Sequence, residues 1–191
     1  MPSKNKVVVL TGAGISAESG LSTFRDSGGL WEGFDVQEVA SIDGWHKNPK
    51  KVLDFYNLRR SQAAKVKPNS THFAIKDLED KFEVKVITQN VDDLHERAGS
   101  SDVVHLHGEL RKARSEFDPD EVIEIGDKEI HLGDVAVYPA ASLIHYAKKD
   151  ARKFIIDPTT PETVILSEWT HIQKKATDGV PKLVNELITN F

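Results

Sequence analysis

The hydrophobic positions of the chain fall into short continuous apolar runs, separated by longer stretches in which apolar residues recur at helical spacing. Continuous runs of β-branched and aliphatic residues are typical of strands that are buried on both faces. Such runs occur at Val7–Leu10, Val84–Thr88, Val103–Leu106, Lys153–Asp157, 164–166 and 169–172. Buried strands that alternate with helical stretches favour a parallel sheet covered by helices, so we predict an α/β fold with a doubly wound parallel sheet.

The helical spacing is clearest after Asn48-Pro49, where Val52, Phe55 and Leu58 fall near one face of a predicted helix. Polar or proline residues at the predicted helix starts support several of these assignments. We expect helices at 15–21, 49–65, 72–81, 92–98, 139–149 and 178–188, and a loop at 24–34. The strand at 84–88, the helix at 92–98 and the strand at 103–106 together predict a parallel crossover.

The segment from Ser115 to Asp134 breaks this alternation, because it is acidic and contains only short β-like runs. Val122–Ile125 and Glu129–Leu132 are separated by Gly126-Asp127, which predicts a hairpin. We therefore expect residues 1–191 to form one domain, with a small inserted hairpin at 111–134 outside the main sheet.

A glycine-rich turn follows the first predicted strand. Gly12, Gly14 and Ala17 fit the G-x-G-x-x-G/A fingerprint of Rossmann-like folds, in which small residues make a tight turn and let the backbone approach a pyrophosphate. Many turns of this kind hold no ligand, so an ordinary strand-to-helix turn remains the alternative. The candidate phosphate-binding residues are Gly12, Ala13, Gly14, Ile15, Ser16 and Ala17.

Composition narrows the class of protein. The formal net charge is −5 with acidic and basic residues interspersed, which argues against nucleic acid as a partner. The absence of cysteine excludes disulfides and thiolate metal sites, and no histidine spacing indicates a metal. The four-residue apolar run before Thr11 is too short for a signal peptide or a membrane span. We expect a soluble cytoplasmic monomer without a metal.

Polar side chains follow two of the predicted strands, where open sheets place their ligand crevice. Gln89, Asn90 and Asp92 come directly after Thr88, and His107 follows the run at 103–106. Amide and carboxylate groups suit sugar hydroxyls and a carboxamide, and histidine suits proton transfer near neutral pH. The alternatives are that Asn90 or Asp92 only caps the next helix, and that His107 is structural.

Tyr56 and Arg59 lie three positions apart on the predicted helix at 49–65, and therefore on neighbouring positions of one face. A hydroxyl beside a guanidinium is suited to holding a carboxylate. The alternative is an ordinary amphipathic helix whose long polar side chains reach into solvent.

Four motifs, in this order and at these separations, resemble the sirtuin family of NAD-dependent protein-lysine deacylases. They are the glycine-rich turn continued through Gly20-Leu21-Ser22-Thr23-Phe24-Arg25-Asp26, then Gly29-Leu30-Trp31, then Thr88-Gln89-Asn90-Val91-Asp92-Asp93-Leu94-His95, and then His105-Leu106-His107-Gly108. The resemblance covers about residues 5 to 111 and resumes from about Val135.

The resemblance implies NAD as cofactor, acyl-lysine proteins or peptides as partners, and roles for individual residues. His107 would be the general base, with Asn90 and Asp92 also catalytic. Contacts with NAD are implied for residues 12–17, Phe24, Arg25, Gln89, Asn90, Val91, Asp92, Asp157 and Ala176. Tyr56-x-x-Arg59 resembles the element of the branch that removes succinyl or malonyl groups, with nicotinamide and O-acyl-ADP-ribose as products. A degenerate NAD- or ADP-ribose-binding module and an NAD glycohydrolase are the alternative functions.

The chain departs from the family pattern in two places. The paired Cys-x-x-Cys motifs of the family's zinc module are absent from 115–134. The family's Trp-Phe-Gly-Glu segment and its strand ending in Gly-Thr-Ser also have no counterpart, because Asp134 is followed directly by Val135. Loss of a central strand would expose apolar faces and unpaired backbone groups. We therefore expect that a block is missing at Asp134–Val135, and a degenerate relative is the rival interpretation.

Overall fold

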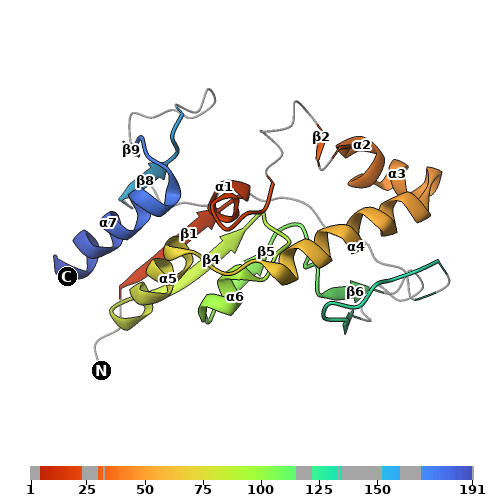
Figure 1. The fold of residues 1–191 in the computed structure, drawn as a ribbon. Coiled ribbons are helices and arrows are strands. Elements are labelled where there is room, and N and C mark those ends of the chain that lie inside the picture. Colours follow the sequence, from red (N-terminus) through yellow and green to blue (C-terminus); the bar gives the residue numbers. More distant parts are fainter. Residues whose placement is uncertain are drawn as a thin grey trace.

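A computed structural model describes residues 5–22, 30–31, 33–114, 122–132, 134, 152–159 and 169–190. Its centre is a parallel sheet of three strands in the order β1-β4-β5, and Figure 1 shows helices packed beside it. The strands are β1 (Lys6–Thr11), β4 (Glu83–Thr88) and β5 (Val103–His105). The predicted strand–helix–strand crossover is confirmed, because β4 and β5 are parallel and α6 (Leu94–Ala98) joins them.

The register of the sheet brings the carboxyl ends of its strands level. Thr11 pairs with Thr88, and Thr88 pairs with His105. The segments that leave these three strands therefore start side by side at one edge, where α/β sheets hold ligands.

Among the helices that were expected, α4 (Pro49–Lys65) agrees with the prediction throughout, whereas two short helices within residues 36–47 were not predicted. The helix after the glycine turn is shorter than expected: it ends at Ala17 with Glu18 as its C-cap residue, and Gly20, in a left-handed conformation, lies in the turn beyond it. The remaining helices are α1 (Ala13–Ala17), α2 (Val36–Val39), α3 (Ile42–Lys47), α5 (Ser70–Asp77), a 3₁₀ turn η2 (Leu78–Asp80) and α7 (Ala176–Thr189).

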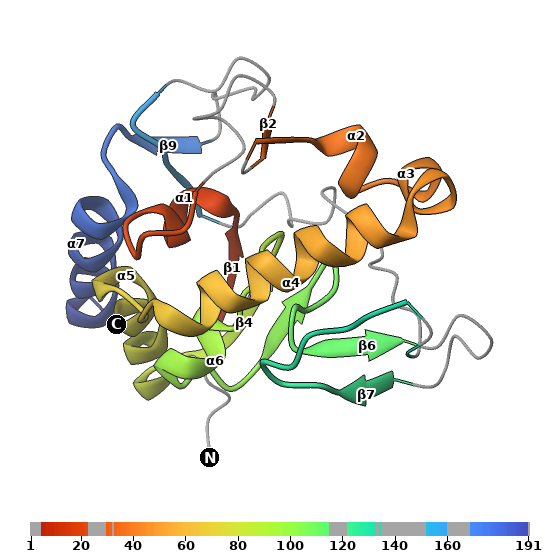
Figure 2. The same cartoon turned by 45° about the vertical axis from the view of Figure 1, so that its right-hand side comes forward.

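The main core lies between the sheet and the helix pair α5 and α7, which lie side by side in Figures 1 and 2. Ile75 of α5 and Val184 of α7 meet Val84 and Val86 of β4 in one buried cluster. Each large aliphatic side chain buried in this way contributes about 1.5–3 kcal/mol to stability. The cluster therefore fixes one face of the sheet.

A second parallel pair is formed by β8 (Lys153–Ile156) and β9 (Trp169–Ile172), as the apolar runs predict. Gly179 lets α7 approach this pair closely, because a Cβ there would lie 2.6 Å from Ile156 Cγ2. The predicted helix at 139–149 and the predicted strand at 164–166 lie outside the described residues.

The predicted hairpin at 111–134 is wrong in its pairing. β7 (Val122–Glu124) pairs antiparallel with β6 (Lys112–Arg114), rather than with 129–132. Ile130 is instead buried against α4, and its backbone N–H and carbonyl both bond the side chain of Asn57 at 2.9 and 2.8 Å. These two bonds satisfy the backbone of Ile130 without a strand partner.

A small antiparallel pair, β2 (Leu30–Trp31) and β3 (Phe34–Asp35), lies at the end of the expected loop at 24–34. Asp35 then accepts a hydrogen bond from Gln37 N and so caps α2.

Candidate functional site

The glycine turn connects β1 to α1 at the edge where the strands end. Gly12 is the N-cap residue of α1, and the Ile15 N–H donates to the Gly12 carbonyl at 3.1 Å. A Cβ built on Gly14 would meet no atom of the described residues within 4 Å, so the backbone there borders space that they leave open. That space lets an anion approach the backbone closely, which is the property that the fingerprint requires.

A network of buried polar side chains ties this turn to the segment after β4. The Asn90 Nδ2 group donates to Ser16 Oγ at 2.9 Å, and its backbone N–H donates to Thr88 Oγ1 at 3.0 Å. Asp92 is buried, and burial raises the pKa of its carboxyl, while bonds from Leu94 N and Ser16 act in the opposite direction. The structure therefore brings Ser16, Asn90 and Asp92 together.

The alternative that Asn90 or Asp92 only caps the next helix holds in part for Asp92 and does not hold for Asn90. Asp92 Oδ1 accepts from Leu94 N at 3.2 Å, near the start of α6, yet the N-cap residue itself is Asp93. Gln89 lies close to the turn as well, because a Cβ on Gly12 would be 3.2 Å from Gln89 Oε1.

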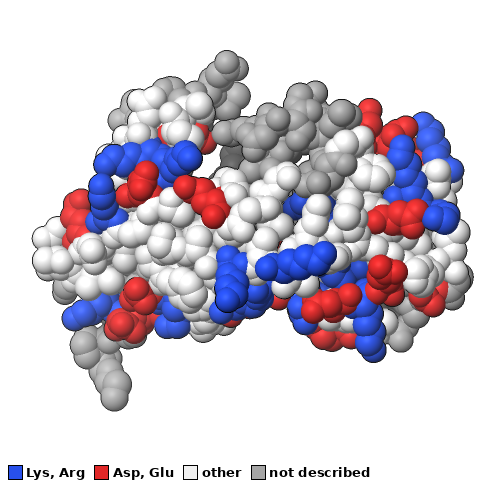
Figure 3. Space-filling view, viewed as in Figure 1, with Lys and Arg blue, Asp and Glu red and all other residues white. Residues whose placement is uncertain are grey.

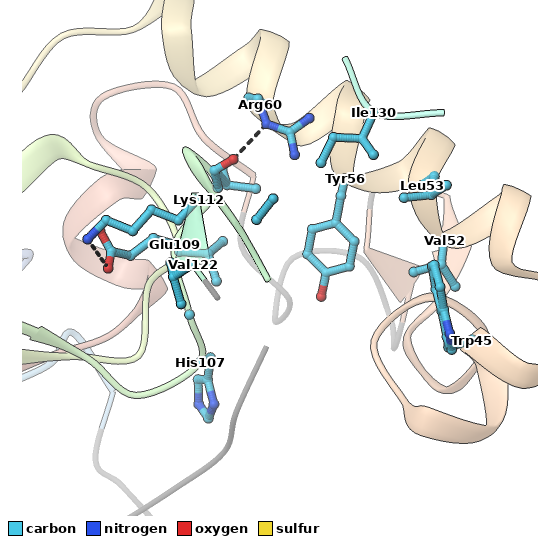
Figure 4. A pocket seen from close by; sticks show the side chains of 14 residues that line it. Trp45, Val52, Leu53, Tyr56, Arg60, His107, Glu109, Lys112, Val122 and Ile130 are labelled. Carbon is cyan, nitrogen blue, oxygen red and sulfur yellow. Dashed lines mark hydrogen bonds and ion pairs between the residues drawn. The ribbon is translucent and has the colours of Figure 1, made fainter. Parts of the chain in front are cut away.

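A cavity of about 110 Å³ lies beside this segment and is lined by Val91, the residue between Asn90 and Asp92. His107 lines it from the segment after β5, Tyr56 and Val52 line it from α4, and Trp45 lines it from α3. Figure 4 shows Tyr56 projecting into the cavity, with Trp45 and Val52 on one side and His107 on another. The site thus combines an imidazole and a phenol with largely apolar walls. The full lining is Trp45, Val52, Leu53, Tyr56, Arg60, Val91, His107, Gly108, Glu109, Leu110, Lys112, Ala113, Val122 and Ile130.

Arg59 is not among the described residues that line this cavity, whereas Tyr56 and Arg60 are. The Arg59 side chain is 5% exposed and its Nη1 donates to Gln62 Oε1 at 3.1 Å, so it does not extend into solvent as the alternative assumed. Arg60 Nε donates to the Leu110 carbonyl at 2.6 Å. Burial lowers the pKa of Arg60, opposed by nearby carboxylates.

Sequence reasoning missed several lining residues, including Trp45, Arg60 and the pair Glu109–Lys112. Lys112 Nζ donates to Glu109 Oε1 at 2.8 Å, and this bond raises the pKa of Lys112. The opposite charges three positions apart after His107 are a signal that could have identified this pair. The sequence pattern carries no comparable signal for Trp45 or Arg60.

Two histidines beside the site belong to its supporting structure. The His95 ring is buried, and its Nε2 lies 3.0 Å from Thr11 Oγ1 at the end of β1. The His105 Nδ1 lies 2.8 Å from the Asn90 carbonyl oxygen, and its Nε2 lies 2.8 Å from Glu96 Oε1. Both rings therefore fix strand ends to the α6 region.

The remaining predicted NAD contacts lie on other elements or outside the described residues. Asp157 follows β8 and its Oδ1 accepts from the backbone N–H and hydroxyl of Thr159 at 2.8 and 2.7 Å. Ala176 begins α7 and packs on the main core. The neighbouring Thr177 donates from its N–H and hydroxyl to Glu18 at 3.0 and 2.7 Å, which holds this end of α7 beside α1. Phe24 and Arg25 are outside the described residues.

The described residues form neither a metal cluster nor a membrane-spanning helix. Within the described ranges, no three histidine or acidic side chains are placed to share a metal ion. The helices in the same ranges include none that is both long and apolar enough to cross a bilayer.

The fold and site define a class of protein. A parallel sheet whose strand ends carry a glycine turn with open space and a polar network is typical of α/β proteins that bind nucleotides. A comparison of sequences names the family: the profile of the Sir2 family matches residues 12–121. This match spans more than half of the chain, and the protein belongs to the Sir2, or sirtuin, family.

Individual relatives agree with this family. An "NAD-dependent protein deacylase" from Helicobacter pylori strain J99 is 45% identical over 223 aligned positions, which cover 95% of each chain. The crystal structure of a Sir2 homologue in complex with NAD superposes with a TM-score of 0.81 at 27% identity, covering 99% of this chain and 91% of the other. A mutant Sir2 homologue in complex with 2'-O-acetyl ADP ribose also has a TM-score of 0.81, at 26% identity, covering 98% and 93%.

Proposed function

We propose that the protein is an NAD-dependent protein-lysine deacylase. The observation that carries this proposal is the meeting of three features at one sheet edge: the open glycine turn, the Ser16–Asn90–Asp92 network and the cavity lined by His107. The relatives named as NAD-dependent deacylases support the same activity.

The residues present fit NAD. The open space at Gly14 suits the pyrophosphate, and Gln89, Asn90 and Asp92 offer amide and carboxylate groups for the ribose and carboxamide. When bound, NAD supplies the nicotinamide–ribose bond that breaks and the sugar that receives the acyl group, so that nicotinamide and O-acyl-ADP-ribose are the products.

The chain's own residues have separate tasks in this proposal. His107 removes a proton from a ribose hydroxyl, because an imidazole accepts protons near neutral pH and this ring borders the cavity. Asn90 is oriented by its bond to Ser16, which leaves its amide oxygen to face the sugar. The apolar walls formed by Val52 and Leu53 suit the aliphatic stem of an acyl-lysine and exclude water.

The proposed substrates are acetyl-lysine and also lysines carrying succinyl or malonyl groups. Tyr56 supports the acidic acyl groups, because its hydroxyl belongs to a cavity-lining side chain. In this proposal Arg59 joins it by directing further N–H groups of its five-donor guanidinium, one of which bonds Gln62, toward the substrate carboxylate. The guanidinium is charged in either bond, and the carboxylate adds an opposite charge and a bidentate geometry.

The decisive experiment measures release of nicotinamide from NAD with an acetyl-lysine peptide, a succinyl-lysine peptide, an unmodified peptide of the same sequence, and no peptide. A deacylase releases nicotinamide only with the acylated peptides. Release without any peptide would identify an NAD glycohydrolase that uses Asn90 and water. Tight binding of NAD or ADP-ribose without release would identify a binding module.

We further propose a cytoplasmic monomer that does not bind nucleic acid. Figure 3 shows Lys and Arg side chains interspersed with Asp and Glu over the described part of the face in view, which offers no single-sign stripe for a phosphate backbone. Size-exclusion chromatography with light scattering tests the monomer, and a salt-dependent shift with duplex DNA would contradict the second point.

A further inference from the structure

The ring of His105 contacts two groups that can only accept hydrogen bonds. Its Nδ1 lies 2.8 Å from the backbone carbonyl oxygen of Asn90, and its Nε2 lies 2.8 Å from the carboxylate of Glu96. A neutral imidazole carries one N–H and can satisfy one of these acceptors, whereas an imidazolium satisfies both. The side chain of His105 is 5% exposed, so water has little access to replace a missing bond.

The surroundings of the ring favour the charged form. Burial alone would lower the pKa of His105, but its bonds to Glu96 and to the Asn90 carbonyl leave it raised. Burial alone would raise the pKa of Glu96, but its bond from His105 leaves it lowered. Among the described residues, the charged or titratable groups that face His105 are Glu96 and His95 of α6, Asp92 before α6, and Glu109 after His107.

These neighbours do not supply a competing positive charge near pH 7. Burial lowers the pKa of His95 to about 4, so this ring is neutral there. The Lys112 ammonium is paired with the Glu109 carboxylate and also interacts with Glu96.

The carbonyl that His105 holds belongs to the segment between β4 and α6 that carries the site. The Asn90 side chain bonds Ser16, Val91 lines the cavity, and Asp92 bonds the first turn of α6. His105 therefore connects this segment to β5 on one side and to α6 on the other. Loss of the Nδ1–H bond would free the peptide that positions the Asn90 side chain.

We propose that His105 is a positioning residue whose protonated ring holds the Asn90–Asp92 segment in the geometry that binds NAD. This rests on the proposed function in so far as NAD is the ligand. A general base must be neutral to accept a proton. The proposals therefore require a neutral His107 and a protonated His105, although the two residues lie two positions apart. A folded-state pKa above the ordinary value means that the His105 contact is complete at low pH and is lost as pH rises through that raised pKa.

The first test reads the protonation state directly, in protein without NAD. Nitrogen-15 NMR of histidine-labelled protein should show both ring nitrogens of His105 protonated at pH 7, assigned by comparison with His105→Gln. Glu96→Gln should lower the pH of this transition by about one unit or more, since a hydrogen bond to a charged group is lost. The exposed His131, changed to Gln, is the matched control and should leave it unmoved. A neutral His105 at pH 7, or no shift in Glu96→Gln, would overturn the proposal.

The second test measures NAD affinity by calorimetry across the same pH range. Wild-type affinity should fall above the NMR midpoint, while His105→Gln should bind at least about tenfold more weakly at pH 7 and with little dependence on pH. Unchanged affinity, or an alkaline loss that persists in His105→Gln, would contradict the positioning role. Neither measurement needs deacylation, so the two proposals can fail separately. Acyl-dependent nicotinamide release together with a neutral His105 would refute this inference alone. A protonated His105 without acyl-dependent nicotinamide release would refute the proposed function alone.

Discussion

His107 is the residue whose removal should separate chemistry from binding. We expect His107→Ala to lower turnover by about 10²–10⁴, because a general base acts chiefly in the transition state. NAD affinity should stay within about tenfold, since the glycine turn and the Asn90 network remain intact. Rates of nicotinamide release and calorimetric NAD titrations check the two parts. Near-normal turnover would remove His107 from the mechanism.

Gly14 tests where the pyrophosphate lies. A Cβ there meets no atom of the described residues within 4 Å, so Gly14→Val should fold normally while filling the space that the anion needs. Calorimetry should show NAD binding lost, with the circular dichroism spectrum and the unfolding transition close to those of the wild type. Retained binding would refute this placement of the pyrophosphate.

Arg59 decides the preference among acyl groups. If its guanidinium meets a succinyl carboxylate in a desolvated pocket, removing it costs ~2–5 kcal/mol of that interaction. Arg59→Met should therefore depress desuccinylation by at least about tenfold and spare deacetylation or improve it. Arg59→Lys keeps the charge but loses the bidentate fork, so its rate of desuccinylation should lie between those of the wild type and Arg59→Met. If both activities fall together, or if neither falls, Arg59 serves the structure of α4 and not the choice of acyl group.

At the scale of elements, α5 and α6 meet through two buried histidines. The ring centroids of His72 and His95 are 5.0 Å apart with an interplanar angle of 62°, and the side chains are 0% and 1% exposed. Burial lowers the pKa of His72 to about 3, helped by the adjacent His95, and burial lowers that of His95 to about 4, opposed by Glu96.

The His72–His95 pair predicts that the folded protein loses stability in acid. In the unfolded chain both histidines bind protons below about pH 6.5, whereas in the folded protein His95 excludes them until near pH 4 and His72 until near pH 3, so the free energy of unfolding decreases as pH falls through this window. Urea unfolding at pH 7, 6 and 5 should show this loss. His95→Gln should make the dependence shallower, whereas the exposed His131→Gln should match the wild type. An equally steep dependence in both variants would contradict the assignment.

The elements also show where sequence patterns succeed. The crossover from β4 through α6 to β5 was predictable because each part is fixed by residues close in sequence. The inserted hairpin was not, because Ile130 is held by Asn57, 73 positions earlier in the chain. A local turn signal at Gly126-Asp127 cannot compete with two hydrogen bonds and burial supplied by a distant helix.

At the scale of the whole molecule, β1 exposes large apolar side chains. Among the described strands it pairs with β4 alone, and Val8 and Leu10 are 65% and 53% exposed. The alignment with the Helicobacter pylori relative spans 223 positions, more than the 191 residues of this chain. We propose that the natural protein contains a further stretch between Asp134 and Val135, which includes a strand beside β1.

The mass of the protein tests this proposal. Protein isolated from its natural source should have an intact mass well above the 21.3 kDa of the present chain, because a strand with its connections adds tens of residues. A measured mass near 21.3 kDa would refute the missing stretch. The rival interpretation, a degenerate relative that binds ADP-ribose without deacylation, would then gain support.

The sequence by itself determined the features that depend on neighbouring residues or on motif order. These are the parallel strands, the glycine turn, the position of His107 after a strand, and membership of the sirtuin family, which the profile match confirms. Each follows from local periodicity or from residues that one segment carries together.

Only the tertiary structure decided which side chains share the site and which protonation state each of them favours. It placed Trp45, Arg60 and Ile130, from three separate segments, around the cavity with Tyr56. It also set the ring of His105 between Glu96 and the Asn90 carbonyl. Such contacts join residues of separate elements, and both burial and hydrogen-bond partners shift pKa values, so neither the contacts nor the pKa values can be derived from residue type and spacing.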